Sequence, residues 1–433
     1  MNPFLRSHYC KEILSEKIGS IVTIAGWIED IRPMGSLVFM IIRDKTGVSQ
    51  VVFNKKNTSS EIFVLVKNVP RQSIVLIKGI LKEGKGKDIP IEVQAEEMQV
   101  LGEAIHPLVL DPTGRVNASI DTRLNARALD LRNVKTMSIF KIKHITLQSI
   151  RRTLSDEGYL EVNTAKIIGQ AAEGGANLFP FDYFDKDAFL AQSPQLFKEQ
   201  LTMSLDRVFE IGSYYRAEKS HTRRHLNEFI SVDIEAAFAE KDDVMETAEK
   251  MVENAAIEVV EKCSDEIKTL GHNIEVPKRP FQRITYAQAI KELNRKGTKI
   301  KKGDDLKDHD LKVLGRIYPK YFWITDWPAN LKPFYIARTP DGKKALSFDL
   351  QHGHLELASG GRRVSDGKEL EERIQESGLF PKSFEDHLKT FRWGMPPHSG
   401  WGFGLDRFIM ILTGMKNIRE VVLYPRDQDR LVP

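Results

Sequence analysis

The stretch Ala191-Gln-Ser-Pro-Gln-Leu-Phe-Lys-Glu199 is followed by Tyr215-Arg-Ala-Glu218, His225-Leu-Asn-Glu-Phe229 and Ser231-Val-Asp-Ile-Glu235. Its hydroxyl, amide and charged side chains suit a small zwitterion, and its arginine, glutamate and aromatic ring suit ATP. A later segment, Gly400-Trp-Gly-Phe-Gly-Leu-Asp-Arg407, adds a second arginine. An isolated Arg-x-Glu or Gly-x-Gly pattern is weak evidence, so the order and separation of these segments decide the prediction.

The composition is that of an ordinary globular protein. Its 433 residues suggest two or three domains at about 150 residues each, and 41% of them are hydrophobic and 29% charged. A net charge of +4 is weak for a nucleic-acid binder. Any contact with RNA must therefore come from local basic patches.

Membrane insertion and secretion are not expected. No run of about 18 apolar residues occurs, and the N-terminus shows no signal-peptide pattern. Cys10 and Cys263 match neither a metal site nor a disulfide framework, which fits a reducing compartment. We therefore expect a cytoplasmic protein of enzyme size that makes no membrane contact.

Residues 20–104 have the pattern of a small β-domain. Short runs of β-branched and apolar residues alternate with turn signals such as Asp44-Lys-Thr-Gly47. The strand-like runs cover residues 21–28, 36–42, 48–53, 73–79 and 89–94, with a helix-like segment at 60–67. Five short strands suggest a closed barrel of the OB type, although another small β-domain fits the same pattern. We assign residues 1–105 to this domain, and residues 106–135, with their proline, glycine and alternating charge, to a hinge.

Residues 136–433 combine longer helices with strands. Apolar residues from Ile139 to Leu154 recur at helical spacing, and Gly158 lies where a helix C-cap is expected. A second amphipathic helix is expected at about 241–262, and a last one after Gly404. Further strand-like runs cover residues 208–211, 229–235, 321–325, 345–350 and 355–357, and the lysine-rich residues 265–320 suggest a peripheral insertion. This order predicts an α+β domain on an antiparallel sheet rather than a doubly wound one.

In this order, the segments resemble motifs 2 and 3 of the class II aminoacyl-tRNA synthetases. The chain resembles aspartyl-tRNA synthetases of the short archaeal and eukaryotic kind along nearly its whole length, from Gly26-Trp27 to the closing Tyr424–Pro433 segment. The resemblance implies an N-terminal OB-fold that binds the anticodon and a class II catalytic domain that dimerises through motif 1. It also implies ATP- and Mg²⁺-dependent activation of L-aspartate and transfer to the 3′ end of tRNA-Asp, with tRNA-Asn left open as a second acceptor.

Amino acid activation joins a carboxylate to the α-phosphate of ATP, which requires positioning and charge neutralisation more than covalent chemistry. We assign Arg216 to the α-phosphate, Glu218 to the adenine side of the site, and Phe229 to one adenine face. Arg407 is assigned to the other adenine face and to the γ-phosphate. Arg216 and Arg407 are therefore the catalytic candidates.

Further candidates lie on both sides of these residues. The ATP contacts are completed by His225, Leu226, Glu356 and Gly404. Carboxylates and hydroxyls are ligands that suit magnesium. The candidate magnesium set is Asp349 and Glu356, which bracket a turn, with Ser359 three residues further on.

The resemblance assigns two cations to the side-chain carboxylate of aspartate. Lys198 matches the family's lysine for this group, and Arg363, seven residues after Glu356, matches its second cation. A bidentate arginine beside a lysine suits a carboxylate and leaves an amide poorly matched. A lysine on a helix surface is the ordinary alternative for Lys198.

The resemblance assigns other residues to the rest of the substrate. Ser193, Gln195 and Asp233 correspond to groups around the α-amino end, where Asp233 supplies the opposite charge. Glu173 lies in a segment that resembles the family's mobile loop and is expected to reach the ammonium group. Ser359 completes the aspartate set.

Two positions depart from the family pattern. Motif 1 normally has a proline after Glu161-Val-Asn-Thr164, but this chain has Ala165, which removes a fixed φ. Family members commonly have a histidine two residues after the substrate arginine, and here the residue is Ser365. The nearby His352 and His354 are more ordinary as exposed loop histidines.

Phe39, Gln50 and Glu92 are the candidate anticodon contacts in the barrel. Phe39 and Gln50, eleven residues apart across a predicted turn, match the family pair that stacks on and hydrogen-bonds the central anticodon uridine. The alternative for Phe39 is a place in the barrel core. Glu29 matches no specificity pattern, so the choice between tRNA-Asp alone and both tRNAs stays open.

Two other functions fit part of the sequence. An asparaginyl-tRNA synthetase has the same architecture but gives no reason for Lys198. An RNA-binding relative with an inactive catalytic domain would not need Arg216 and Arg407 in place.

Overall fold

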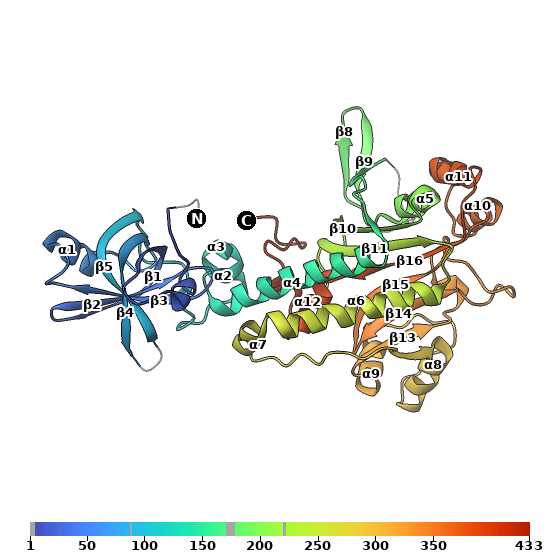
Figure 1. Ribbon diagram of the computed structural model, residues 1–433. Helices are drawn as coiled ribbons and strands as arrows, with labels where there is room; N and C mark the ends of the chain where they lie inside the picture. Colours follow the sequence, from blue (N-terminus) through green and yellow to red (C-terminus); the bar gives the residue numbers. More distant parts are fainter. Residues whose placement is uncertain (1–4, 87–88, 170–177, 220–221) are drawn as a thin grey trace. The chain divides into compact units, whose positions relative to one another are not determined.

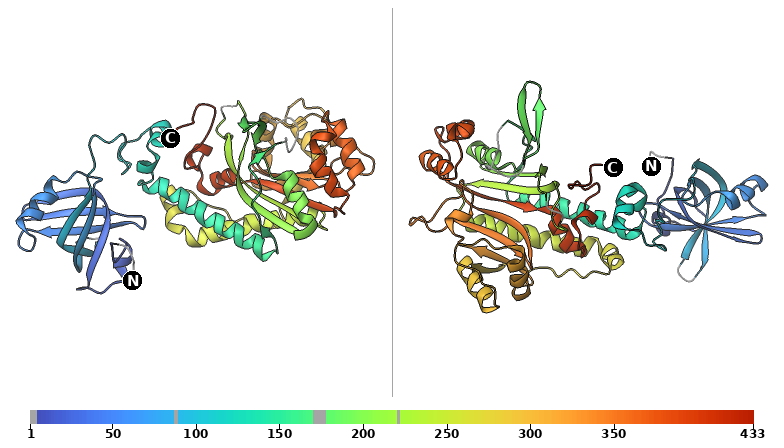
Figure 2. Two further views of the ribbon diagram at one scale, coloured as in Figure 1. Left: turned by 90° about the horizontal axis from the view of Figure 1, so that it is seen from above. Right: turned by 180° about the vertical axis from the view of Figure 1, so that it is seen from behind.

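The computed structural model describes residues 5–86, 89–169, 178–219 and 222–433. The chain divides into two compact units, Met1–Ala118 and Ser119–Pro433. This boundary falls within the segment 106–135. Figure 1 labels the helices and strands of the two units, and Figure 2 shows them from two further directions.

The N-terminal unit contains a closed barrel, which confirms the OB-type fold expected from the sequence. Its strands are β1 (Ile21–Met34), β2 (Leu37–Arg43), β3 (Val48–Asn54), β4 (Ile74–Gly86) and β5 (Ile89–Gly102), in the order β1-β2-β3-β5-β4. β3 and β5 pair in parallel, and the other neighbours are antiparallel. Helix α1 (Ser60–Asn68) follows β3, and the Ser59 hydroxyl caps it by accepting from the Ile62 N–H at 3.2 Å.

An eight-stranded sheet forms the centre of the C-terminal unit, in the order β12-β13-β14-β15-β16-β11-β10-β6. Its strands are β6 (Leu160–Glu161), β10 (Arg207–Tyr215), β11 (Glu228–Ala237), β12 (Gln282–Thr285), β13 (Tyr321–Thr325), β14 (Ser347–His352), β15 (Leu355–Arg362) and β16 (His398–Gly404). The pairs from β13 to β10 are antiparallel, as the sequence predicts. The edge pairs β12–β13 and β6–β10 are parallel, because a long connection containing helices joins the strands of each pair.

Two long helices, α4 (Val134–Asp156) and α6 (Lys241–Lys262), lie side by side along this sheet (Figures 1 and 2). Both match helices that apolar spacing predicts. α4 ends before Gly158, whose φ of +81° is the left-handed conformation expected after a helix C-terminus. Both helices share one hydrophobic core with the sheet, in which Trp401 and Phe403 of β16 are fully buried.

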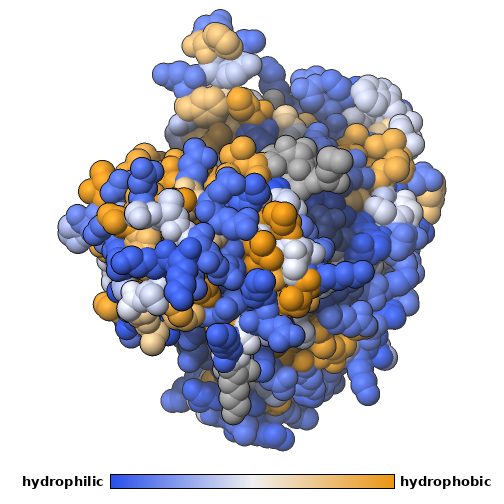
Figure 3. Space-filling model, turned by 60° about the vertical axis from the view of Figure 1, so that its left-hand side comes forward, coloured by the Kyte–Doolittle hydropathy of each residue, from blue (hydrophilic) through white to orange (hydrophobic). Residues whose placement is uncertain are grey.

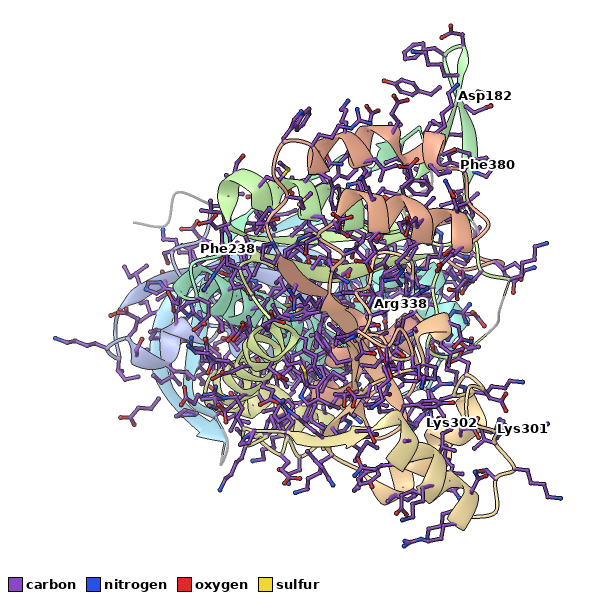
Figure 4. The ribbon with its side chains drawn as sticks, turned by 90° about the vertical axis from the view of Figure 1, so that its right-hand side faces the viewer. Asp182, Phe238, Lys301, Lys302, Arg338 and Phe380 are labelled. Carbon is purple, nitrogen blue, oxygen red and sulfur yellow. The ribbon has the colours of Figure 1, made fainter. Side chains whose placement is uncertain are left out.

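Other elements surround the sheet beside the region of the predicted motifs. Helices α5 (Gln195–Leu205), α10 (Gly367–Glu376) and α11 (Glu385–Phe391) contribute to a second apolar cluster. Strands β7 (Ile167–Ile168), β8 (Pro180–Tyr183) and β9 (Lys186–Leu190) form a small separate sheet. Its β8–β9 hairpin projects from the unit, as the position of Asp182 in Figure 4 shows. Helix α12 (Leu405–Thr413) follows β16 directly.

The lysine-rich segment 265–320 is more ordered than its sequence pattern suggested. It contributes α7 (Ser264–Leu270), the edge strand β12, α8 (Tyr286–Arg295) and α9 (Asp308–Ile317). Apolar residues of α8 and α9 build their own core against β13. Lys301 and Lys302, between these helices, lie well below Asp182 in Figure 4.

The face of the molecule drawn in Figure 3 is mostly hydrophilic, with smaller hydrophobic patches between the polar residues. Such a mixture is usual for a protein surface. Within the described ranges, no helix is both long enough and apolar enough to cross a membrane.

Candidate active site

A cavity of about 310 Å³ lies against strands β11, β15 and β16 of the C-terminal unit. Its wall includes most of the residues that the motifs predict: Ser193, Gln195, Arg216, Glu218, His225, Leu226, Phe229, Asp233, Glu356, Ser359, Arg363, Gly404 and Arg407. Lys198 and Asp349 do not line the cavity, but each forms an ion pair with a residue that does. Glu173 lies outside the described residues.

We call the part of the cavity around Arg216, Phe229 and Arg407 the nucleotide end. Arg216 follows β10, and its guanidinium carbon lies 5.1 Å from the ring centre of Phe229 on the neighbouring strand β11. The Asn227 side-chain amide closes the connecting loop by donating to the carbonyl oxygens of Arg216 at 2.7 Å and Glu218 at 3.0 Å. This hairpin therefore holds a cation and an aromatic face together, the pair that a nucleotide requires.

Arg407 approaches the same region from the first turn of α12. Its Nη1 donates to the Glu356 carbonyl oxygen at 2.8 Å, and its Nε donates to the Arg224 carbonyl oxygen at 3.4 Å. Burial lowers the pKa of Arg407, and the charge of Arg216 lowers it further, against the opposing effect of Glu356. Burial and the charge of Arg407 likewise lower the pKa of His225. The nucleotide end is therefore a region of positive potential that favours a polyanion.

The sequence analysis did not single out Arg224, which also lines this end. It pairs with Asp308 of α9, and its Nη1 donates to the His354 carbonyl oxygen at 3.3 Å. A basic residue immediately before His225 was the available signal. Its position is not apparent from the sequence, because the partners that hold it are 84 and 130 residues away along the chain.

Asp349 and Glu356 come from the neighbouring strands β14 and β15, with Asp349 opposite Ser359. Burial raises the pKa of Glu356, and the charge of Asp349 raises it further. Two like-charged carboxylates in one place suit a divalent cation, which relieves their repulsion. In the described part of the chain no cluster of three or more histidine, cysteine or acidic residues could hold a metal. The two carboxylates are the protein groups of this site whose chemistry suits magnesium.

Lys332 was not predicted, and it contacts this acidic pair. Its Nζ lies 2.8 Å and 2.7 Å from the two carboxylate oxygens of Asp349, and 4.3 Å from the ring centre of Trp327. Lys332 also lines the cavity. A protein cation therefore neutralises Asp349 from the wall of the cavity.

We call the part around Gln195, Asp233 and Arg363 the amino acid end. Lys198 Nζ donates to Asp233 Oδ1 at 3.0 Å and to the Trp401 carbonyl oxygen at 3.1 Å. The lysine is only 2% exposed, which rules out the alternative of a lysine on a helix surface. A buried ammonium group of this kind must be paired, and Asp233 provides the charge.

Arg363 forms a bidentate pair with Glu235, with Nε–Oε1 and Nη2–Oε2 distances of 2.9 Å and 3.1 Å. Lys198 lies 3.6 Å from the same carboxylate. Burial alone would lower the pKa of Arg363, but the charge of Glu235 and its hydrogen bonds, with a smaller contribution from Glu199, together outweigh burial and raise the pKa. Glu235 was not a candidate, although its place two residues after Asp233 on one strand puts both acids on one face of the sheet.

This geometry differs from the expected roles in one respect. The resemblance places Lys198 and Asp233 at opposite ends of the bound amino acid, whereas the structure places them in contact. The Ser231 hydroxyl also donates to the second oxygen of Asp233, at 2.5 Å. Asp233 thus supports the lysine, and its carboxylate is already engaged on both oxygens.

The two departures from the family pattern, Ala165 and Ser365, are not among the residues that form the contacts of the amino acid end described above. The residues on either side of Ala165, Thr164 and Lys166, both contact the buried carboxylate of Glu210. Ser365 precedes Asp366, the N-cap of α10. No contact of either residue explains its difference from the family.

The barrel residues occupy positions consistent with a surface for RNA. On β2, Val38 and Met40 are fully buried, whereas Phe39 between them is only partly buried. Because strand side chains alternate, Phe39 faces the outside of the barrel, which argues against the core alternative. Gln50 is paired to Glu92 across the sheet, with its Nε2 donating to Oε2 at 2.8 Å.

Comparison with known proteins identifies the family. Residues 119–428 match the family of class II tRNA synthetases (D, K and N), and residues 22–101 match the OB-fold nucleic acid binding domain. The chain is 44% identical over 430 residues to an aspartate–tRNA(Asp/Asn) ligase of Methanothermobacter thermautotrophicus, covering 99% of this chain and 98% of the relative. A relative of the same name in Archaeoglobus fulgidus is 44% identical over 427 residues, covering 98% of this chain and 99% of the relative.

The solved structures add a second member of the group. The asparaginyl-tRNA synthetase of Pyrococcus horikoshii complexed with asparaginyl-adenylate superposes with a TM-score of 0.94 at 33% identity, covering 99% of this chain and 100% of the other. A putative aspartyl-tRNA synthetase from Leishmania major superposes with a TM-score of 0.87 at 26% identity, covering 100% of this chain and 97% of the other. The chain therefore belongs to the class II tRNA synthetases of the D, K and N group and carries their ATP-using catalytic fold behind an OB-fold domain for tRNA.

Proposed function

We propose that this protein activates L-aspartate with ATP and transfers it to tRNA-Asp, with tRNA-Asn as a second acceptor. The observation that carries the proposal is the buried array of Lys198, Asp233, Glu235 and Arg363 beneath the amino acid end. Two cations held by two acids present fixed donors to an incoming carboxylate. The relatives at 44% identity, named for aspartate and for both tRNAs, support the same choice.

In the first step, an oxygen of the aspartate α-carboxylate attacks the α-phosphorus, and the bond to pyrophosphate breaks. Arg216 neutralises charge that develops on the α-phosphate, and Phe229 holds one face of the adenine. Arg407 covers the other face and extends to the γ-phosphate. These groups act by position and charge, which suits a reaction between two anions.

Magnesium supplies further neutralisation of the phosphates when it is bound. Asp349 and Glu356 are the residues that would hold it, with Ser359 opposite Asp349 on the neighbouring strand. Lys332 holds Asp349 in place through its contact with both carboxylate oxygens.

In the second step, a hydroxyl group at the 3′ end of the tRNA attacks the carbonyl carbon of the aspartyl-adenylate, and AMP leaves. The amino acid end keeps hold of the aspartyl group during this transfer. Phe39, Gln50 and Glu92 of the barrel read the anticodon by stacking and by hydrogen bonds to base edges.

Motif 1 forms the interface of a homodimer. Its strand β6 is an edge strand of the large sheet, and Leu160 on it is 52% exposed. An exposed edge of this kind is open to pairing with a second chain. The two cysteines, Cys10 and Cys263, are free and buried, which is consistent with a protein of the reducing cytoplasm.

ATP–pyrophosphate exchange tests the proposal most directly. Exchange that depends on aspartate, with asparagine at least about a hundredfold less effective in kcat/KM, is the expected result. Exchange that depends on asparagine would assign the chain to the asparaginyl branch that the Pyrococcus structure represents. If neither amino acid supports exchange, the protein is an RNA-binding relative without synthetase activity.

A further inference from the structure

A buried carboxylate, Glu199, lies directly behind the amino acid end. It is 1% exposed, and its Oε1 accepts from the side-chain amide of Gln195, one helical turn earlier on α5, at 2.6 Å. Gln195 lines the cavity. Glu199 therefore touches a substrate-facing residue without lining the cavity itself.

This contact decides which atom of the Gln195 side-chain amide faces the cavity. A carboxylate only accepts hydrogen bonds, so the NH₂ group of the amide is held toward Glu199. The carbonyl oxygen is then the acceptor that Gln195 can offer to a ligand. An ammonium group has only donors, so this orientation suits the α-ammonium group of an amino acid.

The surroundings keep Glu199 ionised. His398, fully buried at the start of β16, has its Nδ1 at 2.7 Å from the Pro396 carbonyl oxygen and its Nε2 at 3.4 Å from Glu199 Oε2. Both neighbours are acceptors, so both ring nitrogens carry a proton and His398 is an imidazolium. His387 of α11 accepts from the Gln200 amide at Nδ1, so its proton is on Nε2, which lies 3.4 Å from the same carboxylate.

The titratable and charged groups around His398 come from separate parts of the unit. They are Glu199 of α5, His387 of α11, Glu235 of β11 and Arg363, which directly follows β15. Burial would lower the pKa of His398, but its hydrogen bond to Glu199 and the charges of Glu199 and Glu235 outweigh burial and raise it. Burial would raise the pKa of Glu199, but the two histidines outweigh burial and lower it.

We propose that Glu199 is a positioning residue for amino acid recognition, which turns the carbonyl oxygen of Gln195 toward the α-ammonium group of the substrate and is itself held by the protonated His398. The proposal rests on the function proposed above and concerns the part of the substrate that aspartate and asparagine share. If Glu199 acts in this way, the affinity for the amino acid depends on the protonation of His398, although His398 does not contact the substrate.

The test compares Glu199→Leu with Glu199→Gln in ATP–pyrophosphate exchange. Leucine removes the acceptor, so the KM for the amino acid should rise at least about tenfold, as for the loss of one charge-assisted hydrogen bond, with the KM for ATP unchanged. An introduced amide oxygen still accepts from Gln195, so E199Q should stay within about threefold of the parent at pH 7. The exposed Glu371 on α10, changed to leucine, is the matched control, and thermal unfolding shows that each variant is folded.

The pH profile provides a second readout. The proton on His398 is present at low pH and is lost as pH rises through its raised pKa, above the ordinary value of 6.5. The KM for the amino acid should therefore be lowest at low pH and rise above that point, while the KM for ATP does not follow it. In E199Q a neutral His398 suffices, so this dependence should disappear.

Two results would overturn the proposal. One is E199L, folded, with the parental KM for the amino acid, and the other is an unchanged pH profile in E199Q. If exchange in the parent depends on asparagine, the same comparison is made with asparagine, and the inference about Glu199 still stands or fails separately from the choice of substrate.

Discussion

The two ends of the cavity treat buried positive charge in opposite ways. At the nucleotide end, burial and the neighbouring Arg216 lower the pKa of Arg407. At the amino acid end, Glu235 outweighs burial and raises the pKa of Arg363. Burial is the main influence on the first arginine, whereas the second is held in a bidentate pair with an acid.

The difference corresponds to what each ligand brings. ATP carries several negative charges of its own, so it can supply the charge that neutralises Arg216 and Arg407 when it binds. Aspartate is small and brings far less charge than ATP, so the cations that bind its side-chain carboxylate must be fixed in position before it arrives. Lys198 and Arg363 are fixed by Asp233 and Glu235, which hold the two donors in position before the substrate arrives.

The largest effect is expected from breaking the array at the amino acid end. Lys198→Leu should abolish aspartate activation without creating efficient asparagine activation, because Asp233 is left as a buried, unpaired charge. Exchange with each amino acid measures this, and Lys291→Leu, an exposed position on α8, is the control. Unchanged aspartate kinetics would show that the amino acid end lies elsewhere.

The two arginines should differ in their contribution to stability. Arg363→Met leaves Glu235 unpaired and should lower the free energy of unfolding by about 3–5 kcal/mol. Arg407→Met loses two hydrogen bonds to carbonyl oxygens but breaks no bidentate ion pair, so it should cost about 1–2 kcal/mol. Urea unfolding of both variants measures the difference, and equal losses would remove the distinction between the two ends.

Much of the fold could be predicted from the sequence, because apolar residues recur with regular spacing in helices and strands. α4, α6 and the barrel strands follow apolar periodicity, and the motif residues line one cavity as expected. β16 was missed as a strand because its glycines have low β-propensity. The structure explains them, since a Cβ on Gly400 would lie 2.2 Å from the Ile234 carbonyl oxygen.

The partners of the site residues could not be predicted in the same way. Lys332 meets Asp349, and Arg363 meets Glu235, through contacts between elements that are far apart in the chain. Such pairs depend on the register of neighbouring strands and on loop paths, which local pattern does not encode. Asp233 is an example: the residue was identified from the sequence, but its contact with Lys198 was not.

A moderate effect on rate should follow from breaking the nucleotide end. If Arg216 neutralises the reacting α-phosphate, Arg216→Ala loses a contact made mainly in the transition state, about 2–4 kcal/mol, or roughly 30- to 1000-fold in the rate of exchange. Aspartate binding should change much less. Arg295→Ala, on the surface of α8, is the control, and near-normal exchange in Arg216→Ala would remove the residue from the mechanism.

The smallest effect is expected from a substitution in the barrel, which leaves both ends of the cavity intact. Phe39 faces out of the barrel, so Phe39→Ala should lose about 1–3 kcal/mol of tRNA binding by removing a stacking surface for a base. Pyrophosphate exchange without tRNA should be unchanged, because the cavity belongs to the other unit.

Phe53, fully buried on β3, is the matched comparison for this prediction. Phe53→Ala should cost about 3–5 kcal/mol of barrel stability, as expected for a large core side chain. Binding of tRNA and thermal unfolding, measured on both full-length variants, then separate a surface residue from a core residue. If Phe39→Ala destabilised the protein as Phe53→Ala does, with exchange and charging falling in parallel, Phe39 would belong to the core and the anticodon surface would have to be sought on another part of the barrel.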